Sequence, residues 1–376
     1  MNILLIFGTR PEAIKLAPVI LELKKYSYIK TFICVTGQHK EMLKIALDDF
    51  GILPDFNLNI MEPNQSLSSL SSKLIGLLDP LIKEIKPDWI LVHGDTTSAF
   101  VGALSGFYNF IPVAHIEAGL RTYDISSPFP EELNRQMIAR IAKINFCPTL
   151  NNSENLLKEG ISKEKIIITG NTVVDSVLWM KKKFVDQPIF SQSVYSNICS
   201  LVNFNIENSK FILITGHRRE NFGSGFQSIC NAIKKLALIY TDLYFVYPVH
   251  MNPNVKNIVN QLLSNISNVR LIEPVNYPEF VALLSNSLLV LTDSGGIQEE
   301  APIFKKPVLI MRNNTERSES LEFGLSLIVG TNENSICNGV INVINSDAKL
   351  FDFKNNSSLY GDGNAAKIIL KFLTRT

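Results

Sequence analysis

Three carboxylates in the first half of the sequence stand where buried strands would end or a helix would begin. Asp95 follows the run ILVHG, Glu117 follows PVAHI, and Glu131 follows SPFP at the start of a helical pattern. A single such residue is more often a helix cap or a partner of the helix dipole. Three that converge on one sheet edge push one another's proton affinities apart, which gives a site both an acid and a base. The trio therefore predicts acid–base chemistry.

The loop after the first apolar run adds basic side chains. The stretch GTRPEAIK places Arg10 and Lys15 around a helix start, with Pro11 in the first turn. Such a helix N-terminus suits an anion. There is neither a GxGxxG nor a Walker motif, so dinucleotide and P-loop readings lack their main support. A capped helix with solvated charges would explain this loop equally well by itself.

In the second half, the stretch ITGHRRENFG ends an apolar run with His217, Arg218 and Arg219. A lone histidine is usually structural, but one that shares a turn with two arginines favours contact with a phosphate or a reacting group. His250, in YPVHMNP, is a weaker case of the same kind.

The loop LTDSGGIQEEA follows another apolar run and opens a helix. Gly295 and Gly296 let backbone N–H groups approach an anion closely, and Ser294 adds a hydroxyl. A diphosphate is the simplest such anion. Glu300 then either accepts hydrogen bonds from ribose hydroxyls or lies on a solvated helix face.

Two further arginines, Arg312 and Arg317, follow the next apolar run and could cover the phosphates from the far side. The second half of the chain is thus expected to hold a nucleoside diphosphate, and the first half to carry the acid–base chemistry.

Short apolar runs that alternate with helical patterns position these loops. Such a rhythm predicts βαβ units and parallel sheets, and about a dozen strands exceed one ordinary sheet. We therefore expect an α/β protein with two Rossmann-like, doubly wound domains, divided near Gly170. The expected strands are Asn2–Phe7, Thr31–Thr36, Trp89–His93, Pro112–Ile116, Ile144–Cys147, Lys165–Thr169, Lys210–Thr215, Leu243–Pro248, Val269–Ile272, Leu288–Leu291, Pro307–Ile310 and Leu325–Val329.

Composition limits the function classes. The chain has 376 residues and a formal net charge of +1, which argues against a nucleic-acid-binding surface. Its five cysteines form no CxxC pair and no zinc-ligand spacing, so we expect free thiols in a reducing compartment and no metal. We see neither a signal peptide nor a segment that could cross a bilayer, and we expect a cytoplasmic protein.

Eight strings, in order along nearly the whole chain, resemble the bacterial non-hydrolysing UDP-N-acetylglucosamine 2-epimerases: FGTRPEAIK, VHGDTT, HIEAGLRT, SPFPEE, TGNTVVD, TGHRRENFG, YPVHMNPNV and DSGGIQEEAP. The resemblance implies a GT-B-like fold with two domains facing a cleft. It implies residues 1–170 and 171–361 as the domains, with a last helix, about 362–376, packing back on the first. It also implies a homodimer.

The same resemblance implies that UDP-N-acetylglucosamine and UDP-N-acetylmannosamine are interconverted without a cofactor or metal, by loss and re-addition of UDP. The GDTT string, where hydrolysing relatives tend to carry GDR, implies that the UDP-sugar is retained. The catalytic positions that match are Arg10, Asp95, Glu117, Glu131 and His217. Thr96 is expected to hydrogen-bond Asp95 or the ligand.

Further positions match substrate contacts of the family: Arg10, Lys15, Asp95, Glu117, His217, Val275, Phe280, Ser294, Gly295, Gly296, Glu300 and Arg317. Val275 stands where relatives often carry Gln, and Phe280 could equally be core. Lys73, Arg218 and His250 match a second, activating UDP-sugar pocket, with Lys73 replacing the Arg of some relatives; a Lys does not reproduce an Arg fork.

Three alternatives remain open at this point. An epimerase for another UDP-2-acetamido sugar would carry similar motifs. A glycosyltransferase of the same fold would share the glycine-rich loop but would not need the full carboxylate trio. A non-catalytic UDP-sugar sensor would bind ligand without turnover.

Overall fold

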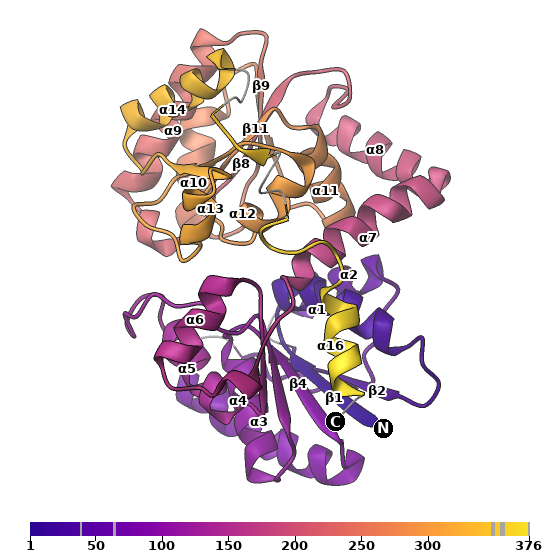
Figure 1. The fold of residues 1–376 in the computed structure, drawn as a ribbon. Helices are drawn as coiled ribbons and strands as arrows, with labels where there is room; N and C mark the ends of the chain where they lie inside the picture. Colours follow the sequence, from indigo (N-terminus) through magenta and orange to yellow (C-terminus); the bar gives the residue numbers. More distant parts are fainter. Residues whose placement is uncertain (38–39, 63–64, 347–349, 354–357, 375–376) are drawn as a thin grey trace. The chain divides into compact units, whose positions relative to one another are not determined.

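The computed structural model describes residues 1–37, 40–62, 65–346, 350–353 and 358–374. Two compact units make up the chain (Figure 1). Unit 1 contains Met1–Leu178 and Tyr360–Thr376, and unit 2 contains Trp179–Leu359. The division falls within helix α7 (Thr172–Asp186), whereas the sequence places it near Gly170, just before this helix.

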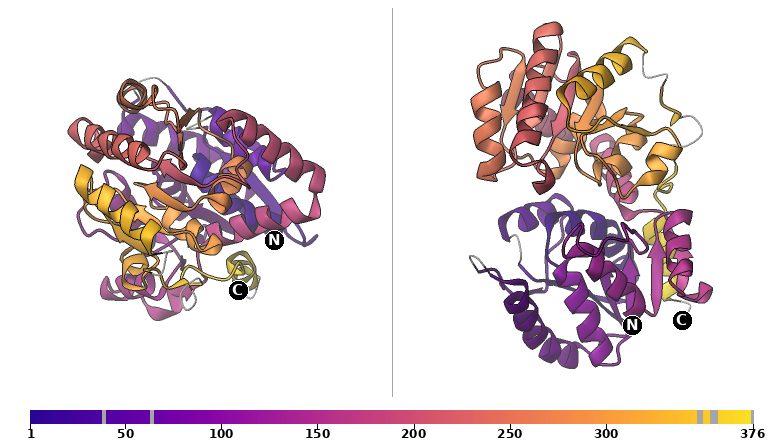
Figure 2. Two further views of the ribbon diagram at one scale, coloured as in Figure 1. Left: turned by 90° about the horizontal axis from the view of Figure 1, so that it is seen from above. Right: turned by 90° about the vertical axis from the view of Figure 1, so that its left-hand side faces the viewer.

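Unit 1 is built on one parallel sheet with the strand order β3-β2-β1-β4-β5-β6-β7. Its central strands are continuous apolar runs because helices cover both faces of the sheet (Figure 2). The strands are β1 (Asn2–Phe7), β2 (Lys30–Val35), β3 (Phe56–Asn57), β4 (Trp89–His93), β5 (Val113–Ile116), β6 (Ile144–Cys147) and β7 (Ile166–Ile168). The helices are α1 (Arg10–Leu23), α2 (Lys40–Asp49), α3 (Leu67–Ile85), α4 (Thr97–Tyr108), α5 (Glu131–Ile141), α6 (Leu150–Lys158), the short η1 (Lys163–Lys165), the first part of α7, and α16 (Ala365–Leu373).

Unit 2 repeats the plan with a second parallel sheet, in the order β10-β9-β8-β11-β12-β13. Its strands are β8 (Phe211–Thr215), β9 (Tyr244–Pro248), β10 (Val269–Ile272), β11 (Leu289–Thr292), β12 (Val308–Ile310) and β13 (Ser326–Ile328). Its helices are α8 (Pro188–Val202), η2 (Arg219–Asn221), α9 (Ser224–Ile239), α10 (Pro253–Leu263), α11 (Tyr277–Asn286), α12 (Ile297–Glu300), η3 (Ala301–Phe304), α13 (Ser318–Glu322) and α14 (Glu333–Asn345).

The expectation of two doubly wound, Rossmann-like domains is confirmed. Each expected strand is present, with ends that agree or differ by a single residue. The two-residue strand β3 is additional, and it is too short to leave a pattern in the sequence.

Each sheet has one point at which the strand order reverses, and ligands of open α/β sheets bind beyond the strand ends at such points. In unit 1 this point lies between β1 and β4, and in unit 2 between β8 and β11. The loops that follow these four strands contain Arg10, Asp95, His217 and Ser294. The topology thus brings the motif loops of each unit to one edge of its own sheet.

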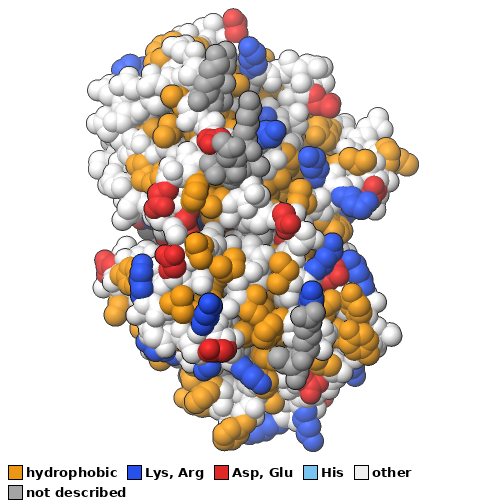
Figure 3. Space-filling model, in the orientation of Figure 1, with side chains coloured by type: hydrophobic (Ala, Val, Ile, Leu, Met, Phe, Trp, Pro, Cys, Tyr) orange, Lys and Arg blue, Asp and Glu red, His pale blue; other side chains and the backbone are white. Residues whose placement is uncertain are grey.

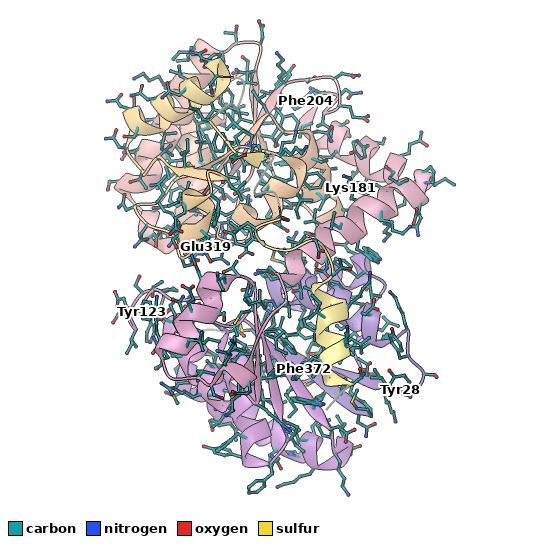
Figure 4. All side chains as sticks on the ribbon, viewed as in Figure 1. Tyr28, Tyr123, Lys181, Phe204, Glu319 and Phe372 are labelled. Atoms are coloured by element: carbon teal, nitrogen blue, oxygen red, sulfur yellow. The ribbon has the colours of Figure 1, made fainter. Side chains whose placement is uncertain are left out.

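The C-terminal helix α16 belongs to unit 1, where it packs on α1. The ring of Phe372, labelled in Figure 4, meets Phe146 of β6 edge-on, with the ring centroids 5.9 Å apart. The returning chain also touches the departing one, because a Cβ on Gly170 would lie only 2.9 Å from the Cα of Gly361. Both residues also have positive φ angles, of 84° and 112°. Glycine is therefore favoured at each position by the close approach and by the backbone conformation.

The surface gives no sign of a single-charge face in the view of Figure 3, in which basic and acidic side chains are mixed on each unit. No helix in the described ranges is long and apolar enough to span a membrane.

Candidate functional site

In unit 1, three neighbouring strands present the predicted residues at the same sheet edge. Arg10 opens α1 directly after β1, while Asp95 and Glu117 follow β4 and β5. β4 pairs with both β1 and β5, and its last residue, His93, is aligned with Ile116. Topology therefore brings Arg10, Asp95 and Glu117 to one region of unit 1.

Glu131 is the first residue of α5, the helix that packs against α4. The same helix supplies the partners of Asp95. Arg135 places Nη2 2.7 Å from Asp95 Oδ2, and Asn134 Nδ2 donates to the Asp95 carbonyl at 2.9 Å. Asp95 is thus a paired strand-end carboxylate, and its side chain remains 23% exposed.

Glu117 is more enclosed than Asp95, with a side chain that is 7% exposed. Its Oε2 accepts hydrogen bonds from the Lys15 ammonium and, at 2.9 Å, from Asn171 Nδ2. Its backbone adopts the left-handed conformation, with φ at 65°, which is strained for a residue with a Cβ. Lys15 therefore lies in the carboxylate cluster as the direct ion-pair partner of Glu117.

Two buried histidines lie behind this carboxylate. His93 Nε2 is 3.8 Å from Glu117 Oε2, and His115 Nε2 is 2.7 Å from the Gly94 carbonyl. Burial lowers the pKa of His93 to about 3 and that of His115 to about 4, although Glu117 opposes the shift in each. Both imidazoles are therefore neutral at physiological pH.

The Thr96 hydroxyl bonds Glu12 where the sequence offered Asp95 as a partner, and a bond to the ligand stays a prediction. Its hydroxyl donates to Glu12 Oε1 at 2.7 Å and accepts the Ala99 N–H at 3.1 Å, so Thr96 caps α4. Glu12 also accepts the N–H groups of Gly8 and Thr9 within the capping box of α1. Burial raises the pKa of Glu12 above its usual value despite these hydrogen bonds. Glu12 thereby ties the loop after β1 to the loop after β4.

In unit 2, a fully buried carboxylate organises the histidine loop. Asp293, directly after β11, accepts the N–H groups of His217 at 3.0 Å and Arg218 at 2.9 Å. Asn221 Nδ2 donates to the same Oδ2 at 3.2 Å. One buried Asp thus fixes the backbone of the loop that follows the neighbouring strand β8.

The ring of His217 remains 44% exposed and stacks on His250, with the ring centroids 5.4 Å apart. Its Nδ1 lies 3.6 Å from Asp293 Oδ1. Desolvation lowers the pKa of His217 and outweighs the opposing effect of Asp293, while Arg218 and His250 lower it further. At neutral pH the His217 side chain is therefore mainly the uncharged imidazole.

The glycine-rich loop packs beneath a guanidinium group. A Cβ on Gly295 would lie 2.4 Å from Arg317 Nη1, so a side chain here would displace the arginine. Arg317 is itself held by Glu299, at 2.9 Å, and by Glu316, at 2.7 Å. The Ser294 N–H is donated to Thr292 Oγ1 at 2.9 Å. Gly296 directly precedes α12, which is only a single turn long.

Glu316 joins three arginines. Its carboxylate lies 2.7 Å from Arg317, 2.8 Å from Arg312 and 3.5 Å from Arg218. Burial alone would raise the pKa of Glu316, but the guanidinium groups hold it well below the usual range. Arg312 is also paired with Glu220. The arginines expected around a phosphate are therefore oriented by carboxylates in this structure.

The remaining candidates of the second half, Glu300, Val275 and Phe280, are buried or partly buried. Glu300 is buried and accepts the Tyr277 hydroxyl at 3.2 Å, so the expectation of a solvated position is wrong. Val275 lies in a core cluster of unit 2, and Phe280 packs against that cluster.

The residues matched to a second pocket are divided between the units. Arg218 and His250 lie beside His217 in unit 2. Lys73 lies on α3 of unit 1, where its ammonium is ion-paired with Glu62.

Residue pattern alone misses the partners that fix these groups: Glu12, Arg135, Asn171, Asp293 and Glu316. The available signal was the rule that a carboxylate at the end of a buried strand needs a partner, which applies to Asp293 as well as to Asp95. Within the described part of the chain, no group of three His, Cys, Asp or Glu residues is arranged to hold a metal ion.

Comparison with known proteins adds the chemistry that such an arrangement serves. The model of the UDP-N-acetylglucosamine 2-epimerase family matches residues 21–374. The UDP-N-acetylglucosamine 2-epimerase of Campylobacter jejuni is 47% identical over 374 residues, covering 100% of this chain and 97% of the relative.

Two solved structures agree over the whole chain. The UDP-GlcNAc 2-epimerase of Neisseria meningitidis, bound to UDP-GlcNAc, has a TM-score of 0.94 at 46% identity and covers 100% of both chains. That of Methanocaldococcus jannaschii, in complex with UDP-GlcNAc and UDP, has a TM-score of 0.88 at 34% identity, again covering 100% of both chains. The GT-B-like, two-domain fold is confirmed by these matches.

Proposed function

This chain belongs to the UDP-N-acetylglucosamine 2-epimerase family, and from that premise we propose that it interconverts UDP-N-acetylglucosamine and UDP-N-acetylmannosamine without a metal or cofactor. The observation that carries the proposal is the position of Asp95 and Glu117, two carboxylates after neighbouring strands, each with its own cationic partner. Such a pair can take a proton from one face of a carbon atom and deliver one to the other.

In the proposed mechanism a carboxylate removes the proton from C2 of the sugar. The C2–H electrons form a C1=C2 double bond, and the C1–O bond to UDP breaks with its electron pair going to the phosphate oxygen. The products of this half-reaction are UDP and a 2-acetamidoglucal. UDP then adds back to C1 while an acid delivers a proton to the opposite face of C2. Asp95, Glu117 and Glu131 are the proposed proton carriers.

Unit 2 is the proposed holder of the nucleotide. Charge develops on the phosphate as the C1–O bond breaks, so donors fixed in advance stabilise that step. Arg10 of unit 1 and His217 and Arg317 of unit 2 are the proposed donors. The Ser294 hydroxyl and the backbone amides of Gly295 and Gly296 assist, whereas the Ser294 N–H is donated to Thr292. Glu300 is the proposed acceptor for the ribose.

One surface feature supports a proposed second copy of the chain. Phe107, Tyr108 and Phe110, at the end of α4, are exposed, and Phe110 is 95% exposed. Apolar side chains gathered in this way suit a second copy of the chain, so we assign the protein as a homodimer. We also propose a cytoplasmic location, as expected from the sequence. Lys73, Arg218 and His250 are the proposed contacts of an activating UDP-sugar.

Proton NMR of the purified protein with UDP-N-acetylglucosamine in deuterated water tests the function. We expect UDP-N-acetylmannosamine to form, with deuterium at C2 of both epimers. Free N-acetylmannosamine with UDP would instead identify a hydrolysing enzyme. If the C2 proton exchanges only in another UDP-2-acetamido sugar, that sugar is the substrate. Binding without any turnover would indicate a non-catalytic UDP-sugar sensor.

A further inference from the structure

Asn171 takes no part in the mechanism above, yet its side chain donates to the carboxylate of Glu117. It is 1% exposed and lies in the loop between β7 and α7. Its Nδ2 donates to Glu117 Oε2 at 2.9 Å, the same oxygen that Lys15 approaches. The amide thus belongs to the immediate surroundings of a proposed proton carrier.

The orientation of this amide is fixed by its other end. Asn171 Oδ1 accepts the Val173 N–H at 3.0 Å, so the carbonyl end must face the helix backbone. The NH₂ end must then face Glu117, because an amide cannot present its acceptor to both sides. Since Asn171 is able only to donate there, it favours a charged Glu117 that accepts.

The backbone of Asn171 makes a third attachment. Its N–H donates at 2.7 Å to the carbonyl of Tyr360, the first residue of the segment that returns to unit 1. Gly170 and Gly361 make their close backbone approach directly beside this bond. One residue therefore connects the Glu117 carboxylate to both chain segments that enter and leave unit 1.

We infer that Asn171 is the positioning residue of Glu117: it holds the carboxylate ionised and immobile, and it ties its position to the junction with Tyr360. This inference rests on the proposed function, since it concerns a proton carrier of that reaction. Asn171 then acts on the ionisation and orientation of Glu117 and not on the binding of substrate.

Other titratable groups also face Glu117, and they define the background for a pH experiment. Lys15 approaches from α1, His93 from β4 and His115 from β5. Both histidines are neutral above about pH 4, so neither changes charge across the neutral range. Asp95 and Glu131 also titrate in acid, but the side chain of Asn171 donates to Glu117, so a shift of the acid limb of the pH–rate profile after changes at Asn171 is assigned to Glu117.

The test uses Asn171→Asp and Asn171→Ala. The Asp variant keeps an acceptor for the Val173 N–H but sets a carboxylate against Glu117. Two adjacent carboxylates share a proton, so the acid limb of kcat moves to higher pH. For Asn171→Ala we expect kcat to fall roughly 10- to 100-fold, the equivalent of one hydrogen bond to a charged group, with KM nearly unchanged.

Asn268→Ala is the matched control. Asn268 is a buried amide of unit 2 whose Nδ2 donates only to backbone carbonyls, those of Ala237, Tyr240 and Leu243. Its loss lowers stability but leaves the pH profile in place. Because a destabilised variant also unfolds more readily in acid, the folded fraction of each variant is measured by circular dichroism over the same pH range, and only a shift at pH values where the variant is folded counts.

The outcomes separate this inference from the proposed function. If the wild-type protein exchanges the C2 proton and both Asn171 variants keep its pH profile and kcat, Asn171 has no positioning role. A loss of activity with an unmoved acid limb, as in Asn268→Ala, also overturns the inference. If the wild-type protein does not exchange the proton, the proposed function has failed.

Discussion

The two units fix their charged groups in opposite ways. In unit 1, cations hold the strand-end carboxylates, as Arg135 holds Asp95. In unit 2, carboxylates hold the cations and their loops, as Glu316 holds Arg317. The proposed proton carriers are thus anions in a compensated setting, whereas the proposed phosphate contacts are cations that are already oriented.

This difference shows how one chain can provide both proton transfer and diphosphate binding. A base must be ionised and still able to take a proton. A neighbouring cationic side chain favours the ionised form of a carboxylate without a metal. A diphosphate needs donors that are in place before it arrives, because reorganisation during bond breaking costs rate. Changes in unit 1 should therefore affect turnover, and changes in unit 2 should affect nucleotide affinity as well.

The largest expected effect is in unit 1. Asp95→Asn and Glu131→Gln should each reduce turnover by roughly 10²- to 10⁴-fold, the usual worth of a general acid or base. UDP affinity, measured by calorimetry, should remain near that of the wild type. Normal turnover in either variant would remove that carboxylate from the mechanism.

His217→Ala tests the other side of the comparison. Loss of a donor to a developing anion costs roughly 10²- to 10³-fold in turnover. Unlike the carboxylate variants, this one should also weaken UDP binding. Calorimetry with UDP distinguishes the two, and unchanged affinity would place His217 away from the phosphate. Arg10→Ala should also lower turnover, measured by proton NMR with UDP-N-acetylglucosamine.

A smaller effect is expected for Glu316→Gln, which removes the shared counter-ion of three arginines. Because the arginines then lose their buried counter-ion, the free energy of unfolding, measured by urea denaturation, should fall by about 2–3 kcal/mol. The matched control is Glu333→Gln, whose carboxylate lies 3.6 Å from Lys235 at the surface. This exposed pair should contribute less than about 1 kcal/mol. Equal losses in both variants would show that the arginine cluster has no special weight.

The smallest effect concerns Asp175 of α7, which accepts the Ala366 N–H at the start of α16. Burial raises its pKa to about 6 from a usual 3.8. The folded state therefore binds this proton more tightly than the unfolded state, and that stabilisation is lost as pH rises from about 4 to 6. Asp175→Asn should raise stability at pH 7 by about 1–2 kcal/mol.

Denaturation of both proteins at several pH values checks this prediction. The difference between wild type and Asp175→Asn should grow from pH 4 to pH 6 and then remain constant. A difference that does not vary with pH would show that Asp175 does not titrate in this range.

The strands and the loops after them could be predicted from the sequence because buried parallel strands are continuous apolar runs. Helix faces were harder. The string SPFPEELNR contains Arg135, but spacing alone does not show that its guanidinium turns toward Asp95. Nor could the partner of Thr96 be foreseen, since Glu12 lies 84 positions away and also belongs to the capping box of another helix, whose N-cap is Thr9.

The division between the units was equally hidden, because α7 is one uninterrupted helical pattern that the two units share. Where the substrate touches each predicted residue stays a prediction.

The return of Tyr360–Thr376 to unit 1 has a consequence for biosynthesis. On the ribosome, the first 178 residues emerge long before the segment that completes their fold. Residues Trp179–Leu359 are made in between, which takes roughly 10–40 s at about 5–20 residues per second. During that interval the site for α16 on α1 is uncovered, so unit 1 is completed by a helix that is translated only after unit 2.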